Sequence, residues 1–214
     1  MELDPAQIDI AARYKLLIGS VVPRPIALVS TKSPAGDENL APFSFFTAVG
    51  SNPMTMLFCP ANKPDGSEKD TLRNAKPTDV GGTGQFVVSV VSEEIVQRVA
   101  AAAEPLEYGQ SEFDFVGLRR APSRVVQPPR VAESPIAFEC ETTQIIRTNP
   151  DQPGGGNIVL GRVVSVFVRD DLINERMHVD PRRLRAIGRM GGMAYCRTGD
   201  RFDLPMGRAA LDND

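Results

Sequence analysis

Two long segments rich in β-branched residues lie next to each other in the sequence, with only a short glycine- and proline-rich stretch between them. Residues 134–148 (SPIAFECETTQIIRT) alternate between apolar and polar over part of their length, and residues 157–173 (NIVLGRVVSVFVRDDLI) are largely β-branched. Such side chains favour strands, and the intervening NPDQPGGG has turn composition. We therefore predict a long β-hairpin, with a bend or bulge at Gly161, where a glycine interrupts the second strand.

Further apolar strands are predicted at 25–31, 54–61 and 85–92, whereas helices are predicted only at 4–17, 69–75 and 92–104. Asp4 is a candidate cap for the first helix, because Pro5 fits the first helical position. Strands dominate, which predicts a mainly β fold, a barrel or a sandwich with a few peripheral helices. The proline-rich stretch 121–135 is too short for a domain linker, so we expect one domain over residues 1–214.

Residues 39–46 (NLAPFSFF) are an unusual apolar stretch. Pro42 cannot donate a ladder hydrogen bond, and Ser44 between two phenylalanines would be an unpartnered polar group in a core. The stretch is therefore either an awkward core segment or the lining of a cavity that holds a polar ligand.

Composition excludes several classes of protein. The chain of 214 residues carries 24 basic and 27 acidic residues, a net charge of −3, which does not favour nucleic-acid binding. It has no apolar run of membrane length, and its N-terminus is too acidic and polar for a signal peptide. The three cysteines, Cys59, Cys140 and Cys196, are odd in number and widely spaced, so we expect reduced thiols and a cytoplasmic location.

The single histidine, His178, leaves little scope for a zinc site or a Ser-His-Asp triad, and no metal site is expected. A lone histidine is more often structural or solvated than a proton donor. No G-x-G-x-x-G motif follows a strand, and there is no Walker A sequence, so neither a Rossmann nor a P-loop nucleotide site is supported.

Three further clusters are candidates for binding. Arg24 lies between two prolines that restrict its backbone, although a solvated arginine at a strand entry has the same sequence. Ser67, Lys69 and Thr71 lie at a predicted helix start and suit a phosphate, although ordinary capped helices look similar. The glycines of RAIGRMGGMAYC (185–196) allow close backbone approach, or simply form a turn.

In their order and spacing these clusters resemble the flavin reductase-like family of FMN-binding split-barrel proteins. The matching pieces lie within residues 14–195: IGSVVPRPIALVST, NLAPFSFFTAVGSNPM, EKDTLRNA, TGQFVVSVV, SEFDFVGL, SPIAFECE and AIGRMGGMAY. The resemblance implies a Greek-key split β-barrel, a homodimer, and FMN bound without a Rossmann motif. Three features depart from the family pattern, namely Ser89 for asparagine, Met190 for leucine, and a C-terminal tail without the usual Arg-Pro ending.

The resemblance also assigns site residues. It places Arg24, Pro25, Ile26, Ser30 and Thr31 along the flavin. It places backbone groups of Asn39, Ala41 and Phe43 at the ring edge, and Ser44 at the ribityl chain or phosphate. Lys69, Asp70 and Thr71 would hold the phosphate, and Arg189 would lie near the site. Pro42 then loses no ladder bond, because its backbone would face a ligand.

The implied activity is reduction of flavin by NADH or NADPH, with the hydride chemistry supplied by the cofactor. Arg24 is the candidate for stabilising the reduced ring, and His178 is a weaker candidate for contact with nicotinamide or substrate. The resemblance leaves open a flavoredoxin-like electron carrier, and a binding module without turnover is a further alternative. Possible partners are a monooxygenase or another redox protein.

Overall fold

The computed structural model describes residues 1–211 and is built around one antiparallel sheet. Its seven strands follow the order β3 (Glu38–Phe43), β2 (Ala27–Lys32), β6 (Gln85–Val90), β9 (Ile136–Arg147), β10 (Asn157–Val168), β5 (Met54–Phe58) and β4 (Phe46–Ser51). The two edge strands, β3 and β4, are consecutive in sequence and separated only by Ser44 and Phe45. Phe43 and Phe46 are only three residues apart, which limits their separation to about 11 Å, so the sheet curls and brings the end of β3 near the start of β4. The predicted mainly β fold is confirmed.

The predicted hairpin is present as β9 and β10, paired from Ile136 and Val168 to Arg147 and Asn157. Its register shifts at Gly161, as the sequence predicts. A Cβ atom there would lie 2.3 Å from Cζ of Phe86, so glycine makes room for this ring inside the barrel.

Buried residues of the strands contribute to three apolar clusters, of which the first two hold most of the core. The inner cluster fills the barrel with Phe43, Phe58, Phe86 and eight other buried residues. The outer cluster includes Leu28 and Leu40 and lies under α3 (Val96–Ala101) and α4 (Glu112–Val116). These two helices therefore cover one outer face of the sheet, whereas α2 (Asp70–Ala75) contributes Leu72 and Ala75 to the inner cluster.

Pro42 lies on an edge strand, where it pairs with Leu28 of β2. Proline is tolerated there because the outward N–H position needs no ladder partner. The edge position therefore accounts for Pro42 without any ligand.

Two predicted helices differ from those observed. The first segment forms a 3₁₀ turn, η1 (Pro5–Gln7), and then α1 (Ile10–Ser20), which Asp9 caps, because Ile8 is extended between them. The helix predicted from residue 92 begins only at Val96. The helix predicted at 69–75 is confirmed as α2 (Asp70–Ala75).

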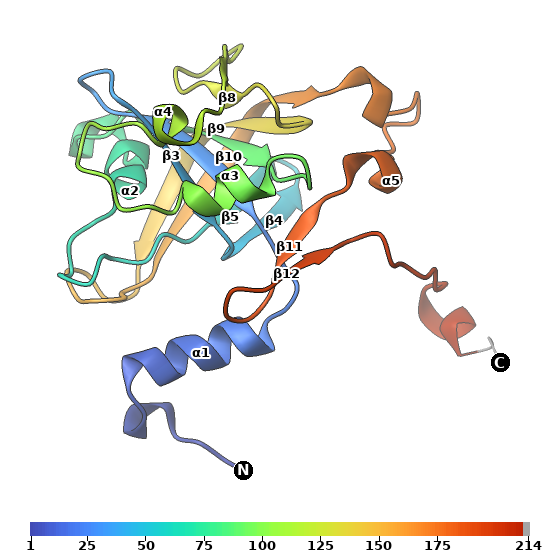
Figure 1. The fold of residues 1–214 in the computed structure, drawn as a ribbon, viewed down its shortest axis with the longest axis horizontal. Helices are drawn as coiled ribbons and strands as arrows, with labels where there is room; N and C mark the ends of the chain where they lie inside the picture. The colour runs from blue at the N-terminus through green and yellow to red at the C-terminus, as the bar shows by residue number, and fades with distance from the viewer. Residues whose placement is uncertain (212–214) are drawn as a thin grey trace.

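A second sheet consists of β1 (Arg24–Pro25), β11 (Ile187–Arg189) and β12 (Tyr195–Arg197), next to α5 (Pro181–Leu184). The remaining elements are short: η2 (Thr78–Val80), β7 (Arg120–Ala121), β8 (Arg130–Val131), η3 (Asp170–Leu172) and η4 (Gly207–Ala210). In Figure 1, α1 and the segment that ends in η4 project from the barrel. None of the helices in residues 1–211 combines the length and apolarity needed to span a bilayer.

Candidate functional site

Arg24 joins three parts of the chain that are distant in sequence. Its side chain is 4% exposed and donates to the carbonyl oxygens of Ile18 (2.6 Å), Val21 (2.8 Å) and Met190 (3.0 Å). Its Nε donates to Ser44 Oγ at 3.2 Å. The guanidinium therefore holds together the end of α1, the β3–β4 corner and the β11–β12 turn.

Four of the five guanidinium N–H groups are used in this way by partners within residues 1–211. Burial is the main cause of the lowered pKa of Arg24, Tyr14 opposes it, and Arg189 adds to it. An arginine stays charged under these conditions. Arg24 is therefore a buried cation with at most one free donor for a ligand.

One face of β2 and β3 leads from this arginine towards α2. Asn39, Ala41 and Phe43 alternate along β3, so their side chains share this face. Phe43 belongs to the barrel core, and the next residue, Ser44, meets Arg24. The face therefore begins at α2 with Asn39 and ends at the buried guanidinium.

The start of α2 brings a second cation to the same face. The Lys69 ammonium lies 5.8 Å from the Phe43 ring centroid, and the Arg24 guanidinium lies 5.9 Å from the Phe45 ring centroid. Partial burial, and then the charge of Lys63, lower the pKa of Lys69, although the residue as a whole is exposed. The corner between β3 and β4 therefore has one cation on each side, Arg24 and Lys69.

Lys69 differs from its neighbours in having no carboxylate partner within residues 1–211. Lys63 and Arg73 both pair with Asp70, at 3.5 and 3.8 Å. Asp70 therefore neutralises other cations, and the Lys69 ammonium is left for an anion. An ammonium that is partly desolvated and unpaired has the chemistry of a phosphate site.

The hydroxyl groups predicted at this site have protein partners. Thr71 Oγ1 accepts from Asn39 Nδ2 at 2.8 Å, and Thr31 Oγ1 accepts from Asn74 Nδ2 at 3.1 Å. Each threonine can still donate its own proton. These buried bonds dock α2 on β2 and β3 and fix the place where the helix begins.

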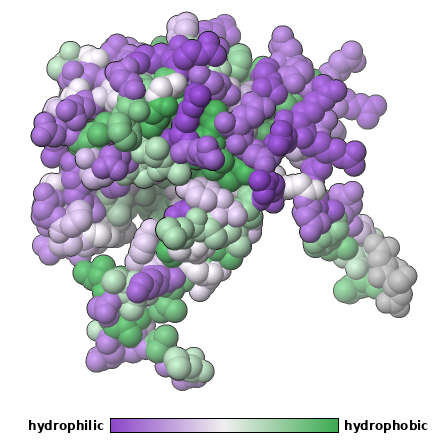
Figure 2. Space-filling model, in the orientation of Figure 1, coloured by the Kyte–Doolittle hydropathy of each residue, from purple (hydrophilic) through white to green (hydrophobic). Residues whose placement is uncertain are grey.

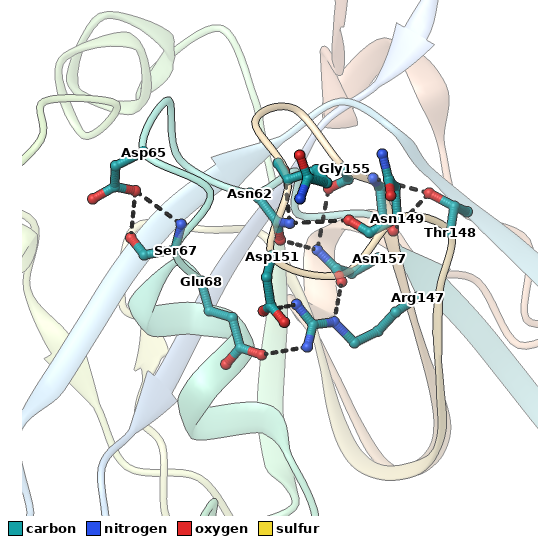
Figure 3. Close-up of polar contacts among 12 residues, drawn as sticks. Asn62, Asp65, Ser67, Glu68, Arg147, Thr148, Asn149, Asp151, Gly155 and Asn157 are labelled. Carbon is teal, nitrogen blue, oxygen red and sulfur yellow. Dashed lines mark hydrogen bonds and ion pairs between the residues drawn. The ribbon is translucent and has the colours of Figure 1, made fainter.

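A polar network holds the loop that leads to Lys69 (Figure 3). Arg147 at the end of β9 binds Glu68 at 3.1 Å and Asn157 at 3.1 Å. Asn157 also donates to Asn62 and to the Pro60 carbonyl, and Ser67 donates to Asp65. The β9–β10 turn therefore positions the loop before α2. The Ser67 hydroxyl is used within that loop, by Asp65.

Three predicted site residues lie outside this face. Ser30 is fully buried and donates to the Pro129 carbonyl, and Ile26 packs in the outer cluster. His178 is exposed in the segment between η3 and α5. The structure does not bring them to the corner between Ser44 and Lys69.

Pro25 and Arg189 lie beside Arg24 in the small sheet. Pro25 is exposed, and Arg189 is paired directly with Arg24 across β1 and β11. The Arg189 guanidinium donates to the carbonyls of Gly192 and Ala194 and lies 4.4 Å from the Tyr195 ring centroid. Arg189 therefore shapes the β11–β12 turn, whose Met190 carbonyl binds Arg24.

Glu112 of α4 was not identified from the sequence. It is 7% exposed, and its carboxylate accepts from the Leu40 amide at 2.8 Å. Burial raises its pKa, the bond from Leu40 opposes this, and Asp70 adds to the rise. Ser111, directly before α4, resembles a helix cap, but no sequence signal shows that the next carboxylate is buried.

A family model described as the flavin reductase-like domain matches residues 18–188. The structure of nitrilotriacetate monooxygenase component B from Bacillus cereus superposes with a TM-score of 0.88 at 32% identity, covering 95% of this chain and 98% of the other. Pseudomonas fluorescens 2-nitrobenzoate 2-nitroreductase NbaA gives 0.83 at 32% identity, with 97% of each chain covered. A split-barrel protein from Shewanella frigidimarina gives 0.80 at 19% identity over 97% of this chain and 100% of the other, which confirms the fold alone.

Proposed function

Since the chain belongs to the flavin reductase-like domain family, we propose that it binds FMN along the face from Arg24 to Lys69 and reduces flavin with NADH or NADPH. The observation that carries this proposal is the ammonium of Lys69. It has no carboxylate partner within residues 1–211, is partly desolvated, and lies beside Phe43 at the rim of the barrel. A phosphate monoester is an anion that would satisfy it.

The residues at the α2 end fit a phosphate. Lys69 supplies charge, and Thr71 retains a proton to donate while it accepts from Asn39. Asp70 contributes indirectly, because its ion pairs with Lys63 and Arg73 remove negative charge that would oppose an anion.

The residues at the other end fit the ring. Phe45 is exposed and offers apolar surface, and Ser44 offers backbone amide and carbonyl groups near Arg24. The remaining N–H of Arg24 is the candidate donor to the reduced ring, and Pro25 would lie alongside. Flavin, when bound, supplies the hydride chemistry. The chain's own residues orient the ring and hold charge beside it.

Turnover with free flavin distinguishes the proposed reductase from the two alternatives. In the presence of NADH or NADPH and excess FMN, a reductase oxidises many equivalents of the nicotinamide nucleotide. A flavoredoxin-like carrier is reduced only by its protein partner, and a binding module does neither. Absence of turnover with either nucleotide would contradict the reductase proposal. His178 stays a prediction for nicotinamide contact, tested by KM for the nucleotide in His178→Ala.

We propose that the chain is a homodimer. Large apolar side chains are exposed on α1 and along the C-terminal segment, and both elements project from the barrel (Figures 1 and 2). They include Ile10, Tyr14, Leu17, Phe202 and Met206. A second subunit would cover them. Sedimentation that shows a monomer at micromolar concentration with FMN bound would contradict this.

The similarity to a monooxygenase component favours a flavin-dependent monooxygenase as the partner that uses the reduced flavin. The test is product formation by such an enzyme when this chain, FMN and a nicotinamide nucleotide are the only source of reduced flavin.

A further inference from the structure

A groove with an apolar end and a basic end lies between α3, β11, β12 and α5, outside the face assigned to FMN. Two adjoining cavities of about 230 and 390 Å³ form it and share Glu93, Ile187 and Arg197. The larger alone falls within the roughly 300–1,000 Å³ of small-molecule sites. The groove is therefore large enough for part of a nucleotide.

The two ends of the groove differ in chemistry. The apolar end is lined by Val96, Ala100, Ile187 and Tyr195, which suit a flat heteroaromatic ring. The basic end is lined by Arg182, Arg185, Arg197 and Arg201. Figure 2 shows hydrophilic side chains gathered around the α5 end of the molecule.

Glu93 is the only acidic residue that lines either cavity in the described part of the chain, and two of the four arginines use it. Arg185 and Arg197 both bind its carboxylate. These bonds lower the pKa of Glu93, so it remains ionised at neutral pH. The side chains of Arg182 and Arg201 make no ion pair or hydrogen bond within residues 1–211, and both are exposed. The groove thus keeps an excess of positive charge.

The apolar end of the groove adjoins the proposed flavin site. Arg24, Arg189 and Tyr195 are direct cross-strand partners on adjacent strands. Adjacent strands are about 4.8 Å apart, so Tyr195 lies roughly 10 Å from Arg24 across the sheet. Ile187 and Arg197 form the next pair on the same face of these two strands, and both line the groove. A molecule extended along this face reaches from the flavin site to the arginines.

We infer that the groove binds the adenosine half of a nicotinamide dinucleotide, with a ribose phosphate at Arg182 and Arg201, and so selects NADPH over NADH. The nicotinamide half crosses the apolar end beside Tyr195 and Ile187, which adjoins the flavin site, because the pyrophosphate joins the two halves of the dinucleotide. Arg185 and Arg197, which both pair with Glu93, bind the bridging pyrophosphate with their remaining donors. The additional phosphate of NADPH is the anion that uses the two arginines without partners. The naming of a dinucleotide rests on the proposed reductase function.

Calorimetric titration with 2′,5′-ADP and 5′-AMP tests the groove without any turnover. The wild-type protein is expected to bind 2′,5′-ADP at least tenfold more tightly than 5′-AMP. The double variant Arg182→Ala, Arg201→Ala is expected to lose this preference, with at least a tenfold weaker affinity for 2′,5′-ADP. Neither side chain has a partner to leave behind, so the variant is expected to fold, which thermal unfolding checks.

The matched control is Arg124→Ala, Arg208→Ala, which removes the same charge from exposed arginines outside the groove. It is expected to bind 2′,5′-ADP within twofold of the wild type. Equal binding of the two nucleotides by the wild type, or equal losses in the two double variants, would overturn the inference. Flavin reduction without 2′,5′-ADP binding would overturn the inference and leave the proposed function intact. Arginine-dependent binding of 2′,5′-ADP without flavin reduction would contradict the function and support the groove.

Discussion

Arg24 and Lys69 are two cations at opposite sides of one corner, and their surroundings differ. The Arg24 guanidinium is buried and is used by three backbone carbonyls and Ser44. The Lys69 ammonium lies at the rim, without a carboxylate partner in the described residues. The sequence motifs indicate both cations as candidate site residues. Only the hydrogen bonds in the structure show that Arg24 organises the site and that Lys69 is available to bind a ligand.

Replacing Arg24 is expected to have the largest effect on stability. Arg24→Ala leaves the carbonyls of Ile18, Val21 and Met190 without their donor, which costs about 3 kcal/mol or more in the free energy of unfolding. Arg24→Lys recovers only part of this, because one ammonium cannot reach all four acceptors. Urea titration measures the change. Lys69→Ala, the control, is expected to stay within about 0.5 kcal/mol of wild type. Equal losses at the two positions would remove the distinction.

The reduction potential of bound FMN tests whether the last N–H of Arg24 acts on the ring. We expect Arg24→Lys, which retains the charge, to keep the potential closer to wild type than Arg24→Ala does. For a two-electron couple about 30 mV corresponds to about 1.4 kcal/mol, and we expect Arg24→Ala to lower the midpoint by some tens of millivolts. Spectroelectrochemical titration gives the midpoint. If it is unchanged while stability falls, Arg24 is only structural.

The pH dependence of FMN binding tests the free cation. Burial lowers the pKa of Lys69 in the free protein, and a bound phosphate would raise it, because the phosphate favours the charged ammonium. FMN affinity should therefore fall as the pH rises from the lowered pKa towards the pKa in the complex. The decline is about tenfold for each unit by which binding raises the pKa.

Two controls separate this decline from other titrations. Lys69→Arg stays charged, so its FMN affinity should remain nearly constant over the same range. Riboflavin shares the titration of the ring but lacks the phosphate, so its affinity should not follow Lys69. A similar decline for both ligands would assign the pH dependence to another group.

The smallest expected effect is that of Glu112 on stability. Glu112 belongs to the Lys69 side of the comparison, because the charge of Asp70, the residue after Lys69, contributes to its raised pKa. Burial raises the pKa of Glu112 above its unfolded value, so the folded state holds its proton more tightly. Its contribution to stability is therefore present at low pH and is lost as the pH rises from the unfolded pKa through the folded one. Glu112→Gln keeps an acceptor for the Leu40 amide and removes this loss.

Denaturant titrations from pH 4 to pH 8 measure the difference between wild type and Glu112→Gln. The variant should gain on the wild type as the pH rises, by on the order of 1 kcal/mol for each unit of pKa elevation. A difference that does not vary with pH would show that the carboxylate is not destabilised by burial.

The local parts of the fold could be predicted from the sequence, whereas contacts between distant segments could not. The β9–β10 hairpin and its irregularity at Gly161 follow from β-branched composition and one glycine. The start of α1 could not be predicted in this way, because Asp4 and Asp9 are both plausible caps. Only the extended backbone of Ile8 in the structure shows that Asp9 caps the α-helix. Pro42 was interpreted through a ligand, since the edge position of β3 depends on the order of strands in the sheet.

The same limit applies to the candidate site. The resemblance assigns Arg24 and Ser44 to different parts of the flavin, whereas they bind each other, and the acceptor Met190 is 166 residues further along the chain than Arg24. The sequence groups Ser67 and Thr71 with Lys69, whereas their hydroxyls bind Asp65 and Asn39. Hydrogen-bond partners depend on the tertiary structure. The sequence therefore indicated Arg24 and Lys69 as candidates but did not show which of them was available to bind a ligand.

Equilibrium binding of FMN and riboflavin to the wild type and to Lys69→Ala tests the central claim most directly. A charge-assisted phosphate contact contributes about 1.5–3 kcal/mol, so FMN should bind the wild type more tightly than riboflavin by about tenfold or more. Lys69→Ala should lose this preference, and its riboflavin affinity should be unchanged. If Lys69→Ala weakens both ligands equally, or if the wild type does not distinguish them, the phosphate does not lie at Lys69 and the account is contradicted.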